Sequence, residues 1–83
     1  MTKWNVIYKI EGHLSDEDKE AIESLDIASV AFNGEGYTTV IGLHLITDTT
    51  GEAVVRAASL IRGTLGREQL GVIEVRVKEV NHE

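Results

Sequence analysis

Apolar residues alternate with polar ones in four segments of this chain, and a period of two is typical of strands that bury one face. The segments are residues 4–10, 27–32, 37–47 and 72–80. We expect the buried sides to carry Trp4, Val6, Tyr8, Ile10, Ala28, Val30, Phe32, Ile41, Leu43, Leu45, Ile73, Val75 and Val77. The segment Asn33-Gly34-Glu35-Gly36 tolerates positive φ angles, so it predicts a turn that joins the second and third strands as a hairpin.

Two other segments carry apolar residues at helical spacing. The first helix is expected from about Asp16 to Leu25, with Ser15 as its N-cap and acidic residues in its first turn. The second opens at Thr49-Thr50-Gly51-Glu52, which matches a capping box, and runs to about Leu65, with Gly66 as its stop. Its apolar side consists of Ala53, Val54, Ala57, Leu60, Ile61 and Leu65.

The predicted elements follow the order β-α-β-β-α-β and use the whole of residues 1–83 as a single domain. Two right-handed β-α-β crossovers joined by a hairpin predict an α+β, two-layer, ferredoxin-like sandwich. In that fold the antiparallel sheet has the strand order 4-1-3-2, and both helices lie on one face. Another two-layer α+β arrangement of the same elements is the alternative.

The composition is that of an ordinary globular protein, with 42% apolar residues, 27% charged residues and no cysteine. Without cysteine the chain has no disulfide, thiolate metal site or thiol nucleophile. No stretch reaches the roughly 20 apolar residues that a membrane-spanning helix needs. The first nine residues also lack the apolar region of a signal peptide, so we expect a cytoplasmic protein.

The residues that carry chemistry do not form a catalytic, cofactor or metal motif. Neither a P-loop nor a dinucleotide-binding glycine motif is present. His13, His44 and His82 are dispersed, without an i, i+4 pair, and are interpreted as exposed polar residues. Acylphosphatases share the expected fold but carry an arginine in the loop after the first strand, where this chain has Glu11-Gly12-His13-Leu14. We expect no enzymatic activity, no metal and no cofactor.

Nucleic acid is not an expected partner. RNA-binding domains of this fold stack bases on aromatic residues of the open sheet face, whereas the strand aromatics here fall on the buried sides. The formal net charge of −6 also opposes contact with phosphates. Only Lys9, Arg76 and Lys78 give the open face a local basic stripe.

The negative charge is concentrated in one segment. Residues 11–26 contain seven acidic residues and one basic residue, which leaves seven of each sign in the rest of the chain (14 − 7 and 8 − 1). An acidic helix is usually a solvated surface that keeps a small protein soluble. The alternative is a docking surface for a protein partner with a basic patch, carried by Asp16, Glu17, Glu20 and Glu23.

A second hypothesis concerns the sheet face that the helices leave open. Aliphatic side chains there lie among polar ones, and ferredoxin-like domains often dimerise through this face. Single exposed aliphatics are also normal on protein surfaces. The predicted self-association surface consists of Ile7, Val40, Gly42, His44 and Ile46.

The segments "EGHLSDEDKEAIE", "GEAVVRAASLIRGTLG" and "VIEVRVKEV", with the alternating hairpin between the first two, resemble small ferredoxin-like proteins of actinobacteria and their phages. Since most of those proteins have no assigned activity, the resemblance implies a fold and no site residues. The expected function is a small non-catalytic protein-interaction or regulatory module, such as a phage or bacterial accessory factor. A small-ligand-sensing ferredoxin-like dimer is the alternative.

Overall fold

A computed structural model of the chain describes residues 1–33 and 37–80, and it is α+β. Its elements in chain order are β1 (Thr2–Glu11), α1 (Asp16–Glu23), β2 (Ala28–Asn33), β3 (Thr38–Thr47), α2 (Thr50–Leu65) and β4 (Val72–Glu79). The residues Gly34, Glu35 and Gly36 of the predicted turn lie outside the described residues, as does His82.

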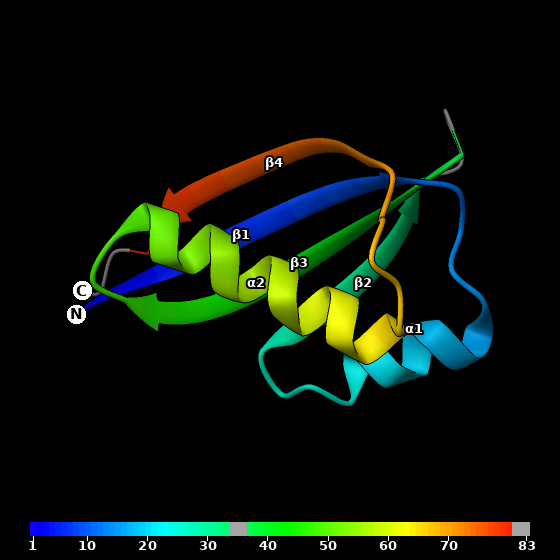
Figure 1. The fold of residues 1–83 in the computed structure, drawn as a ribbon, viewed down its shortest axis with the longest axis horizontal. Coiled ribbons are helices and arrows are strands. Elements are labelled where there is room, and N and C mark those ends of the chain that lie inside the picture. Colours follow the sequence, from blue (N-terminus) through cyan, green and yellow to red (C-terminus); the bar gives the residue numbers. More distant parts are fainter. Residues whose placement is uncertain (34–36, 81–83) are drawn as a thin grey trace.

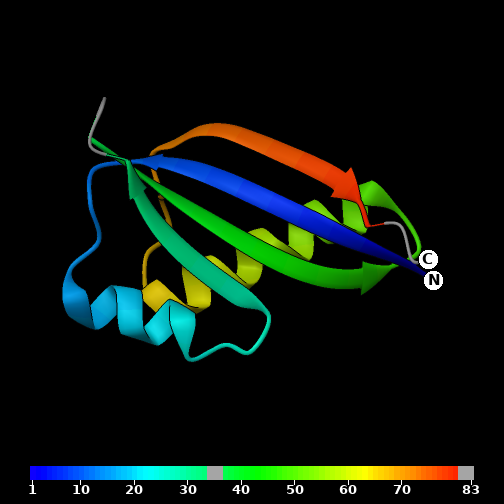
Figure 2. The same cartoon turned by 180° about the vertical axis from the view of Figure 1, so that it is seen from behind.

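The four strands form one antiparallel sheet in the order β2-β3-β1-β4, which reads 4-1-3-2 from the β4 edge (Figure 1). β1 lies between β3 and β4, and its residue Val6 is opposite Leu43 of β3 on one side and Val77 of β4 on the other. Both helices lie on the same face of this sheet, as Figure 2 shows from behind. No helix among the described residues covers the other face (Figure 2).

The core lies between the helices and the covered face. Alternation places every second residue of β1 and β3 there, as the sequence predicts, and α1 contributes Ile22. α2 packs on β3 and β1, and its buried alanines allow a close approach. The buried apolar residues are Val6, Tyr8, Ile10, Leu14, Ile22, Ile41, Leu43, Leu45, Ala53, Ala57, Ala58 and Ile61.

Both helices begin where their caps predict. The Ser15 hydroxyl accepts a hydrogen bond from the Asp18 N–H at 3.1 Å, and the Thr49 hydroxyl accepts one from the Glu52 N–H at 3.2 Å. Gly66 ends α2 in the left-handed region, with φ +66°. α1 ends at Glu23, two residues before the expected Leu25, because the backbone tightens there into a Leu25 N–H to Ile22 carbonyl bond of 3.0 Å.

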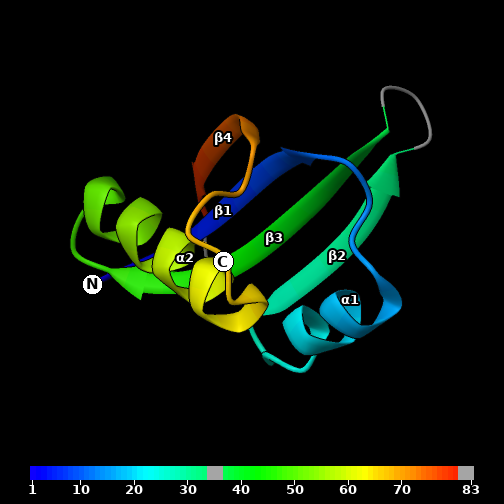
Figure 3. The ribbon, with the colours of Figure 1, turned by 45° about the vertical axis from the view of Figure 1, so that its right-hand side comes forward.

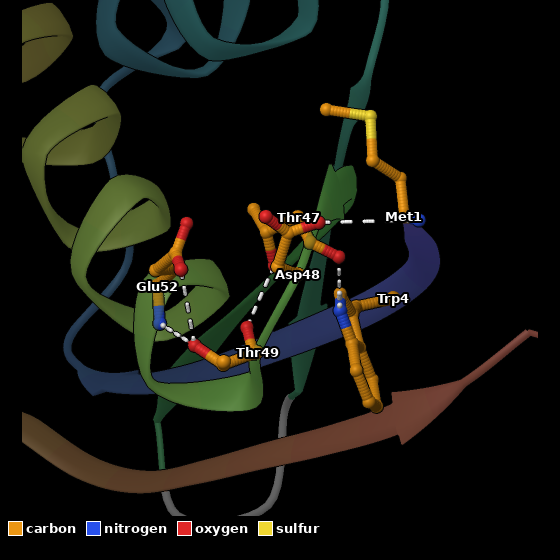
Figure 4. A network of polar contacts seen from close by, with 6 residues as sticks. All are labelled: Met1, Trp4, Thr47, Asp48, Thr49 and Glu52. Carbon is orange, nitrogen blue, oxygen red and sulfur yellow. Dashed lines mark hydrogen bonds and ion pairs between the residues drawn. The ribbon is translucent and has the colours of Figure 1, made fainter.

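A short polar network ties the end of β3 to β1 and to α2 (Figure 4). The Trp4 indole N–H donates to the Thr47 carbonyl at 3.3 Å. The buried Thr47 hydroxyl donates to the Thr49 carbonyl at 2.7 Å, next to the cap of α2. The network therefore fixes the direction in which the chain leaves the sheet and enters the helix.

The prediction of a buried set in β4 is wrong. Ile73 is 51% exposed, Val75 is 38% exposed, and only Val77 is half-buried and packs against the core. α2 lies over β3 and β1 and leaves β4 largely uncovered. The pairing of β1 with β4 also shifts at Ile73. Lys9 is opposite Glu74, but the next residue of β1, Ile10, is opposite Val72, so Ile73 has no partner on β1.

Tyr8 connects the sheet directly to the backbone of α2. Its side chain is only 3% exposed, and its hydroxyl donates to the Val54 carbonyl at 2.9 Å. Burial raises the pKa of Tyr8 above its ordinary value of 10.0, and the positive charge of Arg62 opposes this shift. The folded protein therefore favours the neutral phenol.

We expect Tyr8→Phe to lower the free energy of unfolding by about 1 kcal/mol at neutral pH, because one buried hydrogen bond is lost. Because the folded-state pKa is raised, the stability from Tyr8 is fully present below about pH 10 and is lost as the pH rises through the folded-state value. The free energy of unfolding, measured with urea at neutral pH and at about pH 11, should therefore fall more between these two pH values in the parent than in Tyr8→Phe. Tyr37→Phe, which removes an exposed hydroxyl, is the control. Equal losses in the parent and Tyr8→Phe would contradict this role.

The cap of α2 gives a second test. Thr49→Ala leaves the Glu52 N–H without its side-chain acceptor, so the free energy of unfolding should fall by about 1 kcal/mol. Thr50→Ala removes a hydroxyl of the same kind one residue later and should cost less. Denaturant unfolding of both variants measures the difference, and similar values would argue against a capping role for Thr49.

Candidate functional site

α1 turns its acidic side chains away from the core. Asp16, Glu20 and Glu23 follow one another at spacings of four and three residues, so they lie on one side of the helix, with Glu17 beside them. All four are exposed, whereas Ile22 on the other side is fully buried. The four predicted partner-binding residues therefore share the exposed surface of α1, the helix that Figure 3 shows next to β2.

Ion pairs neutralise only part of this surface. Lys19 Nζ lies 3.1 Å from Glu23 Oε1, one turn away along the helix. Arg67 lies 3.2 Å from Asp18 Oδ2, and Asp18 is half-buried and outside the predicted set. No ion pair among the described residues includes Asp16, Glu17 or Glu20. The charges of Asp16, Glu17 and Glu20 therefore have no ion-pair partner within the part of the chain that the structure describes.

Three aromatic rings stack close to the beginning of this helix. The His13 ring lies 4.8 Å from the Phe32 ring and 4.1 Å from the Tyr37 ring, between centroids, with interplanar angles of 21° and 14°. All three side chains are exposed, Phe32 by 40% and Tyr37 by 65%. The prediction of Phe32 as a core residue is therefore wrong: the ring is on the expected side of β2, opposite Thr39, but a loop histidine stacks on it there.

The loop between β1 and α1 is fixed to the hairpin end by hydrogen bonds. The Gly12 N–H donates to the Tyr37 carbonyl at 2.8 Å, and the Thr39 hydroxyl donates to the Gly12 carbonyl at 2.6 Å. Gly12 has φ +79°, a conformation that glycine adopts without steric cost. Asp16 follows His13 by three residues, so at most about 11 Å separates the Cα atom of His13 from that of Asp16, the first of the four acidic residues.

We call the combination of these features the acid–aromatic surface. It is made of Asp16, Glu17, Glu20, Glu23, His13, Phe32 and Tyr37. The sequence indicated only its acidic half, because helical spacing is a local signal. His13 and Tyr37 are far apart in the sequence and come together only when the loop closes on the hairpin end.

The five residues predicted for self-association also share one surface, the open sheet face. The register places Ile7 opposite Gly42, and Ile46 there is 53% exposed. Ile7 and Val40 are only half exposed, and charged residues lie opposite them, Arg76 opposite Ile7 and Lys9 opposite Val40. A Cβ on Gly42 would lie 3.3 Å from the Ser29 hydroxyl, so the glycine allows a close approach within the sheet. The face is a mixture of aliphatic and charged side chains.

In residues 1–33 and 37–80, no three His, Asp or Glu side chains gather closely enough to hold a metal ion. His44 lies on the open sheet face, away from the aromatic stack that contains His13. Within the same ranges no helix has both the length and the apolar character needed to cross a bilayer.

Comparison with known protein families, curated proteins and solved structures finds no match to this chain. The function must therefore be inferred from the surfaces of the molecule. The acid–aromatic surface is the strongest candidate, because it combines three carboxylates that make no ion pair with a described residue and exposed rings next to a loop that backbone hydrogen bonds hold in place.

Proposed function

We propose that this chain is a small, non-catalytic protein-interaction or regulatory module that docks a basic protein partner on the acid–aromatic surface. The observation that carries this proposal is the exposed stack of His13, Phe32 and Tyr37 close to the beginning of a helix on which Asp16, Glu17 and Glu20 make no ion pair with any described residue. Aromatic side chains are frequent binding hot spots, and surrounding charges steer the partner and set its orientation. An Arg or Lys of the partner has both a carboxylate and a ring face available.

The fold is compatible with such a role without specifying it. We interpret the β-α-β-β-α-β order and the antiparallel sheet as a ferredoxin-like sandwich, a fold that hosts many unrelated functions. The resemblance to small actinobacterial and phage proteins favours a cytoplasmic accessory factor that acts on a bacterial or phage protein.

A small-ligand-sensing dimer is the alternative function. A shallow depression on the open sheet face, lined by Ile7, Lys9, Val40, Glu74 and Arg76, is the observation that favours it. Binding of an effector there would raise the melting temperature in a concentration-dependent way. The acid–aromatic surface is better supported, because its rings and carboxylates are more exposed than Ile7 and Val40.

The test is a pull-down from the native cell's lysate at low and moderate salt, followed by titration of the captured protein after purification. Glu17→Lys/Glu20→Lys should reduce affinity and make the remaining binding less dependent on salt, because two steering charges are reversed. Tyr37→Ala should reduce affinity and leave the salt dependence unchanged, because it removes a ring and no charge.

The matched control is Asp48→Lys/Glu79→Lys. It makes the same change in net charge on exposed residues beyond the end of β3 and at the end of β4, away from the hairpin end. Binding by Glu17→Lys/Glu20→Lys that is as tight as binding by the parent would show that α1 is only a solvated helix. An equal loss in both would show attraction by net charge instead of a docking surface.

A further inference from the structure

The outer side of β4 is an unpaired strand edge that carries apolar side chains. β4 is the last strand of the sheet, pairs with β1 alone among the described strands, and exposes Val72, Ile73 and Val75. Next to it, a groove between β4 and α2 is lined by apolar residues that include Val55, Leu70 and Val75. An exposed edge of this kind is a template for pairing with another strand.

The bonds to β1 determine which backbone groups of β4 point outward. The Val80 N–H donates to the Lys3 carbonyl at 2.9 Å, so these two residues form a hydrogen-bonded pair. Hydrogen-bonded and non-hydrogen-bonded pairs alternate along an antiparallel ladder. Lys78 and Arg76 therefore also direct their backbone groups toward β1, whereas Val77 and Val75 direct their N–H and C=O groups to the free edge.

The charged residues on either side of Val75 have opposite signs, so two antiparallel copies of β4 can pair with opposite charges facing each other. Glu74 and Arg76 flank Val75, lie on the open face opposite Lys9 and Ile7, and approach each other at 3.1 Å. In an antiparallel pair with Val75 opposite its own copy, Glu74 of each strand is opposite Arg76 of the other. A shift of two residues in one direction puts Arg76 opposite Arg76, with Glu74 opposite Lys78, and a shift in the other direction puts Glu74 opposite Glu74. Like charges directly opposite are destabilising, and of these three registers only the one about Val75 has no like-charge pair among Glu74, Arg76 and Lys78.

We propose that a second copy of this chain binds at this edge, so that two β4 strands pair antiparallel about Val75 and form one continuous sheet across a two-fold axis. The N–H and C=O of Val75 point to the free edge, so the two copies of Val75 can form a hydrogen-bonded pair. Glu74 and Arg76 then occupy non-hydrogen-bonded positions, where facing side chains are closest. The charged residues that discourage pairing at most sheet edges attract each other in this register.

The open sheet face is a less suitable place for the second copy. Face-to-face contact would bury Lys9, Arg76 and Lys78, and the described strand residues of that face carry more basic side chains (Lys3, Lys9, Arg76 and Lys78) than acidic ones (Glu11 and Glu74). The edge contact leaves these side chains at the solvent. It also does not depend on the proposed docking function, because α1 packs on β2 at the opposite edge of the sheet.

The experiment is sedimentation equilibrium of the full chain over a range of concentrations, with a parent mass of twice 9.1 kDa as the expected result. Glu74→Arg and Arg76→Glu each place like charges opposite one another twice per dimer, so each should raise the dissociation constant about tenfold or more. An equimolar mixture of the two variants restores opposite charges at both positions. The mixture should therefore regain the parent's mass.

Two further variants separate the edge from the open face. Val75→Pro removes an N–H that points away from β1, so it should dissociate the dimer while circular dichroism shows an intact fold. Val40→Glu, on the open face, should leave the dimer intact. A monomeric parent at millimolar concentration would overturn the proposal. So would single charge variants that keep the parent's mass, or dissociation by Val40→Glu alone.

Discussion

The close contact of α2 with β1 and β3 is the constraint on which the rest of the structure depends. Ala53, Ala57 and Ala58 are buried along one side of α2 and let it lie near the sheet. The Tyr8 hydroxyl can then reach the Val54 carbonyl. A helix about 10 Å wide covers about two strands that are about 4.8 Å apart. α2 covers the central pair and α1 packs on β2, so β4 is left without a helix.

This distribution gives the two edges of the sheet different chemistry. At the β2 edge the acidic side of α1 lies beside a loop that Gly12 and Thr39 hold against the hairpin end. At the β4 edge, aliphatic side chains and outward backbone groups are exposed, with Glu74 and Arg76 alternating along the strand. In our proposals, one edge binds a basic partner and the other pairs with the same strand of a second copy.

The sequence predicted those parts of the structure that depend on local geometry. Alternation in β1 and β3, the caps at Ser15 and Thr49 and the stop at Gly66 are signals within a few residues, and the structure follows them. The acidic side of α1 is also predicted by a local signal, the helical spacing of its acidic residues. Phe32 and Val75 show the limit, because alternation identifies the face of a strand but not what covers it. The shift at Lys9 and Ile10 and the stacking of His13 between Phe32 and Tyr37 arise from contacts between distant segments.

The position of α1 on β2 has a consequence for recognition if two chains join at β4. The two docking surfaces would then lie at the far ends of one sheet, on the order of 30–40 Å apart. Capture of one basic site would raise the effective concentration of the second surface near a neighbouring site. Such an arrangement selects partners whose basic sites repeat at a matching distance, as in a symmetric oligomer, and it converts a weak single contact into avidity.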